Sequence, residues 1–185
     1  MRRAFLALAL LSGSLAVGSV AAQPSPAREA TDIRNAPVAV GGWRYEKSDT
    51  DVHFFYCDQP SCAPGSKVSY RLYGPNQQMD LEQFRRQQEM IVRTLEQRAA
   101  PGTHIDLIAV EGDNHAGLPR LFKSRRIVTA PDGTKEYVIS GLIIGSRFSS
   151  SLISSSSEEK ANDTYYALFA VALTLAAQVN SNTAR

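Results

Sequence analysis

The sequence has no surplus of either charge that would point to a strongly charged partner. It contains 20 Lys and Arg against 18 Asp and Glu. Arg2 and Arg3 lie in an N-terminal segment that we expect to be removed, so the rest of the chain carries 18 residues of each sign. Nucleic-acid-binding proteins show a basic excess. The composition therefore argues against that class of partner.

A local cluster of basic residues interrupts this balance. It consists of Arg120, Lys123, Arg125 and Arg126. These positions fall on a predicted strand, in which successive side chains point to opposite faces. We expect a solvated face there rather than an anion-binding site.

The short motifs that mark common catalytic sites are also absent. The sequence contains no glycine-rich phosphate loop, no Gly-x-Ser-x-Gly elbow and no His-Glu-x-x-His motif. Histidine itself occurs only three times. We therefore expect a protein without enzymatic activity and without a bound cofactor.

Long hydrophobic runs are missing except at the N-terminus. Arg2 and Arg3 precede the apolar run Ala4–Leu11, and small residues follow as far as Ala22. This is the pattern of a secretory signal peptide, and the apolar core is too short for a membrane span. We expect cleavage near Ala22, a periplasmic or secreted location, and no transmembrane segment in the mature chain.

The remaining sequence predicts one domain with short flanking segments. Residues 23–40 contain Pro24, Pro26 and Pro37 with few large apolar side chains, as in a flexible N-terminal arm. Residues 41–180 have the length of a single domain with its own core. Residues 181–185 form a C-terminal tail.

Cysteine occurs only twice, at Cys57 and Cys62. An even number of cysteines in an exported chain favours a disulfide, here across a turn-like segment that contains Pro60. No second ligand pair for zinc lies nearby, and the spacing differs from that of a thioredoxin-type motif. A redox or metal role for the two thiols is the alternative.

The secondary-structure pattern predicts an α+β fold. Strand-like runs cover residues 52–57, 67–72 and 103–110. Leu118–Gly145 reads as a hairpin around the turn formers Pro131, Asp132 and Gly133, and we place this hairpin at the centre of the sheet. Helices are predicted over residues 80–99 and 158–179. We expect an antiparallel β-sheet sandwiched by these two helices.

The first predicted helix has a clear start and an apolar stripe. Asp80 and Gln83 have the spacing of a capping box. We expect the stripe to be buried on the sheet, so that Leu95→Asp would unfold the domain. The stripe consists of Leu81, Phe84, Ile91, Val92 and Leu95.

The second predicted helix follows a serine-rich segment in which eight of the residues 146–157 are serine. This segment is compatible with a flexible loop, or with the frayed end of a strand plus a helix N-terminus. Capping boxes are available from Ser155 with Glu158 or from Ser156 with Glu159. The helix itself is apolar almost all round, which predicts a buried helix.

One group of histidines and acidic residues could bind a metal ion. Its members are His104, Asp106, Glu111, Asp113 and His115. His104 and Asp106 would point to the same side of a strand, and nitrogen and oxygen ligands of this kind suit a divalent metal. An acid–base pair is the other functional interpretation, and solvated side chains at a strand edge are the commoner outcome.

The order of elements behind a signal peptide resembles the PsbP-like superfamily, including its small bacterial exported members. The shared features are Trp43 near the start, Val110-Glu111-Gly112 before a turn, the Pro-Asp-Gly hairpin and a serine-flanked terminal helix. The resemblance implies an antiparallel sheet between helices. It also implies a non-enzymatic accessory or binding role, and it supplies no catalytic residue.

Three functional hypotheses follow. The first is an exported accessory or binding domain whose protein or small-molecule partner the sequence does not identify. The second is a metal-binding protein or metal-dependent hydrolase that uses the residues from His104 to His115. The third is a cell-envelope interaction protein that uses the serine-rich segment, residues 149–157.

The disulfide hypothesis predicts a modest loss of stability when both cysteines are replaced. Closing so short a loop stabilises by about 2 kcal/mol in the chain-entropy model. The Cys57→Ser/Cys62→Ser variant should fold with a Tm lowered by about 4–8 °C, and mass spectrometry of the exported protein should find no free thiol. A variant that is fully folded but functionless would show a chemical role for the thiols instead.

Overall fold

The computed structural model of the chain describes residues 40–113 and 117–178. These residues form seven strands and two helices. In chain order they are β1 (Arg44–Lys47), β2 (Val52–Tyr56), β3 (Lys67–Tyr73), α1 (Leu81–Arg98), β4 (His104–Gly112), β5 (Arg120–Thr129), β6 (Lys135–Ile144), β7 (Ser149–Ser156) and α2 (Glu159–Ala177). The predicted signal peptide, most of the N-terminal arm and the C-terminal tail lie outside the described residues.

All seven strands belong to one antiparallel sheet with the order β1-β2-β3-β7-β6-β5-β4. The strands before α1 form one half of the sheet, and β4, β5 and β6 form most of the other. The two halves meet where β7 pairs with β3 on one side and with β6 on the other. The last strand in the sequence therefore lies in the middle of the sheet.

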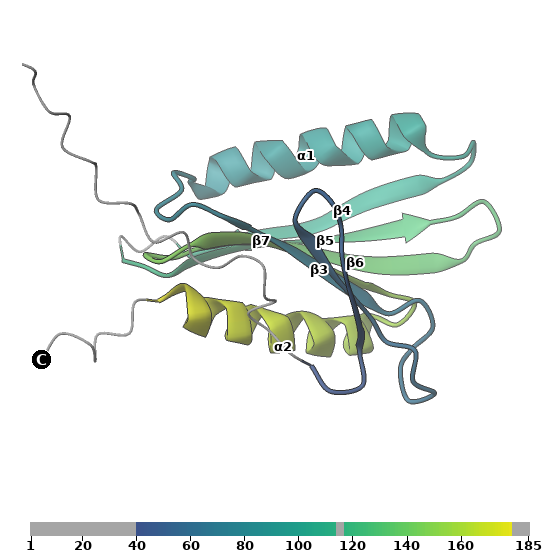
Figure 1. The fold of residues 1–185 in the computed structure, drawn as a ribbon. Coiled ribbons are helices and arrows are strands. Elements are labelled where there is room, and N and C mark those ends of the chain that lie inside the picture. Colours follow the sequence, from purple (N-terminus) through teal and green to yellow (C-terminus); the bar gives the residue numbers. More distant parts are fainter. Residues whose placement is uncertain (1–39, 114–116, 179–185) are drawn as a thin grey trace, which may run out of the picture. The chain divides into compact units, whose positions relative to one another are not determined.

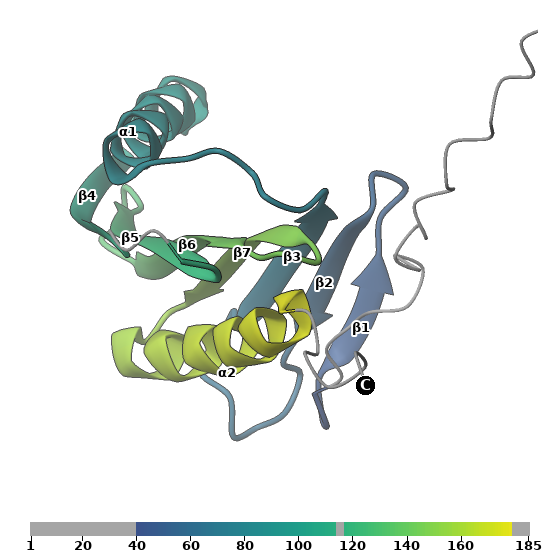
Figure 2. The ribbon, with the colours of Figure 1, turned by 90° about the vertical axis from the view of Figure 1, so that its left-hand side faces the viewer.

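The two helices cover opposite faces of the sheet, as Figures 1 and 2 show. Helix α1 contacts β4 and β5, whereas α2 contacts β7, β6 and β3. The predicted α+β fold, an antiparallel sheet sandwiched by helices, is confirmed. Each helix covers only part of its face, because the strands that α1 contacts are not those that α2 contacts.

The β5–β6 hairpin forms as predicted but does not occupy the centre of the sheet. Its turn begins after Thr129, which pairs with Lys135. Gly133 has a φ of +85°, a conformation that glycine adopts at low cost, and the Asp132 carboxylate accepts a hydrogen bond from the Thr134 amide at 2.9 Å. The hairpin lies between β7 and the edge strand β4, and β7 takes the central position.

The serine-rich segment is this central strand, so it is neither the flexible loop nor the frayed strand end that the sequence left open. Six of the eight residues of β7 are buried. Small side chains let α2 lie close to the strand: the Ser154 hydroxyl donates to Asn162 Oδ1, and Asn162 Nδ2 donates to the Tyr137 carbonyl at 2.8 Å. Most serines of the segment are therefore covered, and the cell-envelope hypothesis keeps only the partly exposed Ser151 and the exposed Ser157 as serines that a partner could reach.

Helix α2 begins without the predicted capping box. Its N-cap is Glu158, whose side chain makes no capping hydrogen bond, and the Glu158 amide instead donates to Ser156 Oγ at 3.3 Å. The expectation of a helix buried all round is also wrong. Leu168, Val171 and Leu175 are 49%, 60% and 64% exposed, because no strand or helix among the described residues covers that side.

Helix α1 has its predicted start but not its predicted burial. The Asp80 carboxylate accepts from the Gln83 amide at 2.7 Å, and Gln83 Oε1 accepts from the Asp80 amide at 2.9 Å. In the helix itself only Phe84 and Gln88 are buried, and Leu95 is 39% exposed. The reason is that α1 packs on β4 and β5 alone, so part of its apolar stripe faces an uncovered area of the sheet.

The main core lies between α2 and the sheet. Phe169 and Leu173 of α2 pack with Tyr70 of β3, Ile143 of β6 and Leu152 of β7. Trp43 contributes edge-to-face contacts to the rings of Tyr165 and Phe169 at centroid distances of 5.0 and 5.8 Å. A smaller cluster under α1 contains Phe84, Phe122 and Ile144.

Cys57 and Cys62 form a disulfide with a Cα–Cα distance of 6.1 Å, at the end of β2 where the chain turns toward β3. This geometry agrees with the predicted pairing. Neither helix in the described part of the chain is long and apolar enough to cross a membrane.

The observed packing of α1 predicts a large loss of folding stability for one substitution in this helix and a small loss for another. Phe84→Ala removes a 2% exposed ring that packs on Phe122, which should cost about 3–5 kcal/mol. Leu95→Asp, at a position open to water, should cost less than about 1 kcal/mol. Urea unfolding measures both, and equal destabilisation by the two variants would contradict this packing.

Candidate functional site

Each face of the sheet has an uncovered area beside its helix, and each uncovered area contains a groove. On the α2 face, β5 and β4 have no helix over them. On the other face, α1 leaves β7 and β3 uncovered. The two grooves differ in charge, so we describe them separately.

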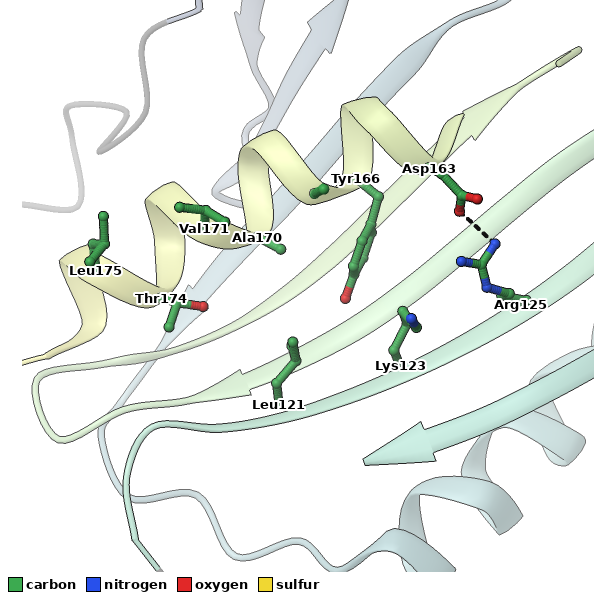
Figure 3. A pocket seen from close by; sticks show the side chains of 10 residues that line it. Leu121, Lys123, Arg125, Asp163, Tyr166, Ala170, Val171, Thr174 and Leu175 are labelled. Atoms are coloured by element: carbon green, nitrogen blue, oxygen red, sulfur yellow. Dashed lines mark ion pairs between the residues drawn. The ribbon is translucent and has the colours of Figure 1, made fainter. Parts of the chain in front are cut away.

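The first groove, here called the α2 groove, lies between α2 and β5 and has a volume of about 620 Å³ (Figure 3). Its walls are mainly apolar, and the ion pair of Arg125 with Asp163 lies toward the N-terminal end of α2 (Figure 3). The lining residues are Leu121, Lys123, Arg125, Asp163, Tyr166, Ala167, Ala170, Val171, Thr174 and Leu175.

The charged side chains of the α2 groove are all engaged in ion pairs. Lys123 Nζ lies 3.1 Å from Glu111 Oε2 of β4, and Arg125 Nη1 lies 2.5 Å from Asp163 Oδ1 of α2. Figure 3 shows the second pair at the end of the groove. The groove is therefore an apolar surface bounded by balanced charges, without a free charge to attract an ion.

Tyr166 reaches from α2 to the floor of this groove (Figure 3). The Tyr166 ring is buried, its hydroxyl has no hydrogen-bond partner among the described residues, and burial raises the pKa of this hydroxyl. The hydroxyl lies against Gly141 of β6, where a Cβ atom would clash with it. Gly141 therefore leaves the space against β6 that the hydroxyl end of Tyr166 occupies.

The second groove, here called the α1 groove, lies on the opposite face between α1 and the middle strands. It comprises two cavities of about 340 and 410 Å³ that share Arg126 and Ile153 in their linings. Apolar side chains from the helix and the sheet form most of the walls. They include Phe84, Ile91, Leu95, Val138 and Leu142.

Arg126 is the distinctive polar residue of the α1 groove. Its Nη1 donates to Ser140 Oγ at 2.8 Å, while its buried Nε has no hydrogen-bond partner within residues 40–113 and 117–178. Burial lowers the pKa of this guanidinium. No carboxylate among the described residues lies within 4.0 Å of it, whereas Arg125 on the other face has Asp163. The expectation of a solvated basic face is therefore wrong for Arg126.

The residues proposed as metal ligands are not brought together. His104 Nε2 lies 2.8 Å from Asp106 Oδ1, so these two share a side of β4 as predicted. Glu111 pairs with Lys123, and Asp113 accepts a hydrogen bond from the Leu121 amide. His104 and Glu111 are seven residues apart on one strand, which is roughly 23 Å at the rise of a β-strand.

A metal ion cannot bridge that distance, so the predicted ligands do not form one site. His115 lies outside the described residues, and residues 40–113 and 117–178 contain no group of three potential His, Cys, Asp or Glu ligands. The metal hypothesis thus loses the arrangement that motivated it.

Sequence reasoning missed both grooves. It noticed Arg125 and Arg126 only as members of a basic cluster, and Tyr166 only as part of an apolar helix. The alternation of a strand does predict that neighbouring arginines face opposite sides. The sequence does not show which strands each helix covers. The position of the helices decides that Arg125 meets a carboxylate of α2, whereas Arg126 meets no carboxylate among the described residues.

No protein-family model and no curated protein sequence matches this chain. Among solved structures, the chain is similar to the solution structure of cyanobacterial PsbP (CyanoP) from Synechocystis sp. PCC 6803. The identity is 12%, the match covers 76% of this chain and 95% of that chain, and the TM-score is 0.45.

The contact between Tyr166 and Gly141 is testable with a pair of substitutions. Gly141→Ala should destabilise the fold, because the new methyl group meets the Tyr166 hydroxyl. Tyr166→Phe removes that oxygen, and the double variant should recover about 1 kcal/mol relative to additivity. Thermal unfolding of the four proteins measures this coupling, and strict additivity would show that the two groups do not touch.

Proposed function

We propose that the protein is an exported, non-enzymatic accessory domain that binds an amphipathic helix of a partner protein in the α2 groove. The observation that carries this proposal is the row Leu168, Val171 and Leu175, which α2 leaves exposed directly beside the groove. These residues are spaced as on one side of a helix. Contiguous exposed apolar surface of this kind marks interaction sites.

The layer structure of the fold supports a helix as the occupant. On the α1 face a helix packs over β4 and β5, whereas on the α2 face the same two strands have no helix. The uncovered strip runs beside α2 (Figure 2). A partner helix laid along it would bury the apolar side of α2 and complete the second layer.

The charge distribution favours a protein partner over a charged small molecule. Lys123 and Arg125 are each neutralised by an acidic neighbour at the edge of the groove. An apolar centre with a polar rim is the usual anatomy of a protein interface. Leu168 lies outside the cavity lining, so the apolar surface extends beyond what a small ligand in the groove would cover.

The lining of this groove supports binding rather than catalysis. Its hydroxyl groups belong to Tyr166 and Thr174, and neither is paired with a histidine or a free carboxylate that could act as a base. The N-terminal signal pattern and the Cys57–Cys62 disulfide support export, since disulfides persist in oxidising compartments.

Substitution of the exposed apolar row tests the proposal. Val171→Asp places a carboxylate in the centre of the interface and should weaken partner binding at least tenfold, because the charge would be desolvated in the complex. The variant should remain folded, since Val171 is 60% exposed. A photo-crosslinker at Leu175 identifies the partner in cell-envelope extracts, and binding of the purified partner is then compared between variants.

Met90→Asp is the matched control, because Met90 is a similarly exposed apolar residue, 62% exposed, on α1. This variant should bind the partner like the unmodified protein. Equal binding by Val171→Asp would refute the proposed site. A homodimer in light-scattering measurements that Val171→Asp dissociates would show a second copy as the occupant, and would also overturn the proposal as stated.

A further inference from the structure

The α1 groove carries an inference that goes beyond the proposed protein-binding function. Arg126 is a cation on the floor of this groove, and no carboxylate among the described residues lies within 4.0 Å of its guanidinium, although Glu136 acts on it from a longer distance. Its only hydrogen bond in the described structure goes to a neutral hydroxyl, that of Ser140, and its Nε is buried and unpaired. Buried charges in proteins are normally paired, because desolvation of an unpaired charge is costly.

The nearest candidate counterion is already occupied. Glu136 lines the same cavity, and its Oε1 lies 3.1 Å from Lys67 Nζ, which also lines it. Arg98 is the remaining charged residue of that cavity. In the other cavity Arg126 is the only charged side chain. The α1 groove therefore has a net positive charge, in contrast to the balanced α2 groove.

Neutral hydrogen-bonding groups lie beside the arginine. Gln88 is buried, and its Oε1 accepts from Ser124 Oγ at 2.9 Å, so its amide NH₂ is left as a donor. Ser140 and Ser151 line the same cavity. Donors of this kind, grouped with a guanidinium, suit the oxygens of a carboxylate or a phosphate.

The remaining walls are apolar, and they explain why the stripe of α1 is only partly buried. Ile91 and Leu95 face the groove from the helix, and Leu142, Val138 and Ile153 face it from the sheet. The groove follows α1 from Phe84 to Ala99, roughly 22 Å at the rise of an α-helix. Arg126 lines both cavities and so lies between two apolar compartments.

We infer that the α1 groove binds an anionic amphiphile, with its acidic group paired to Arg126 and its apolar body between α1 and β6–β7. Charge complementarity identifies the acidic group, because the described lining of the groove has more cations than carboxylates and the one carboxylate, Glu136, is paired with Lys67. The apolar walls require the hydrocarbon body. A free inorganic anion would satisfy Arg126 but leave Ile91, Leu95 and Ile153 exposed.

Dodecanoate is a suitable probe, with dodecanol as its uncharged counterpart and inorganic phosphate as an anion without an apolar body. Titration calorimetry of the mature protein should give dodecanoate a Kd at least tenfold lower than that of dodecanol. Phosphate should bind at least tenfold more weakly than dodecanoate. Equal affinity for dodecanoate and dodecanol, or no binding of dodecanoate, would overturn the inference without any variant.

Arg126→Gln should lose this discrimination: dodecanoate should bind at least tenfold more weakly, and dodecanol should be unaffected. The matched control is Arg125→Gln, which removes the neighbouring arginine on the opposite face, and it should leave both affinities unchanged. Arg126→Lys keeps the charge without the forked geometry and should restore part of the dodecanoate affinity. Undiminished binding of dodecanoate by Arg126→Gln would refute the role of this residue.

Ile153→Glu tests the site without removing the arginine, which guards against a folding defect in Arg126→Gln. Ile153 is an exposed residue that lines both cavities with Arg126. Its replacement supplies a carboxylate to the groove and should lower dodecanoate affinity at least tenfold. Unchanged affinity in this variant would place the ligand elsewhere. Val171→Asp should not affect dodecanoate, so failure of one proposal is distinguishable from failure of the other.

Discussion

The pairing of β7 with both β3 and β6 is the interaction on which the rest of the structure depends. It joins the strands formed before α1 to those formed after it, across about eighty residues of chain. The serines of β7 make this position usable, because small side chains let α2 approach the strand closely. Asn162 then ties the helix to β7 through Ser154 and to β6 through the Tyr137 carbonyl. Central placement of α2 follows from these contacts.

The central placement of α2 also determines where the protein is open. A helix over β6, β7 and β3 leaves β5 and β4 bare on its own face. Helix α1 follows β3 and precedes β4 in the chain, and it packs on β4 and β5. On the face that α1 occupies, β7 and β3 therefore have no helix over them. The two grooves thus arise because the helices on the two faces lie over different strands. They differ in the side chains that β5 and its neighbours present to each face.

The sequence contained enough local signal to predict several elements of this fold. The Asp80–Gln83 capping box, the turn at Pro131–Gly133 and the cysteine pairing depend on short-range geometry, and each is found. The position of the serine-rich strand was not predictable, because serines on both faces give no apolar periodicity. The burial of the α1 and α2 stripes was overestimated for a different reason: periodicity shows which side of a helix is apolar, not whether a strand lies under all of it.

Arg125 and Arg126 show how far such coverage alters the chemistry of adjacent residues. Both belong to one basic run in β5, and the alternation of the strand sends them to opposite faces. Arg125 meets the N-terminal part of α2 and finds Asp163 there. Arg126 lies under the open side of α1, where the helix offers Gln88 and apolar side chains but no carboxylate. The same residue type is therefore a structural ion pair on one face and an unsatisfied cation on the other. Since a partly desolvated cation without a carboxylate partner costs free energy that folding must offset, a ligand anion that pairs with Arg126 would stabilise the folded protein as it binds.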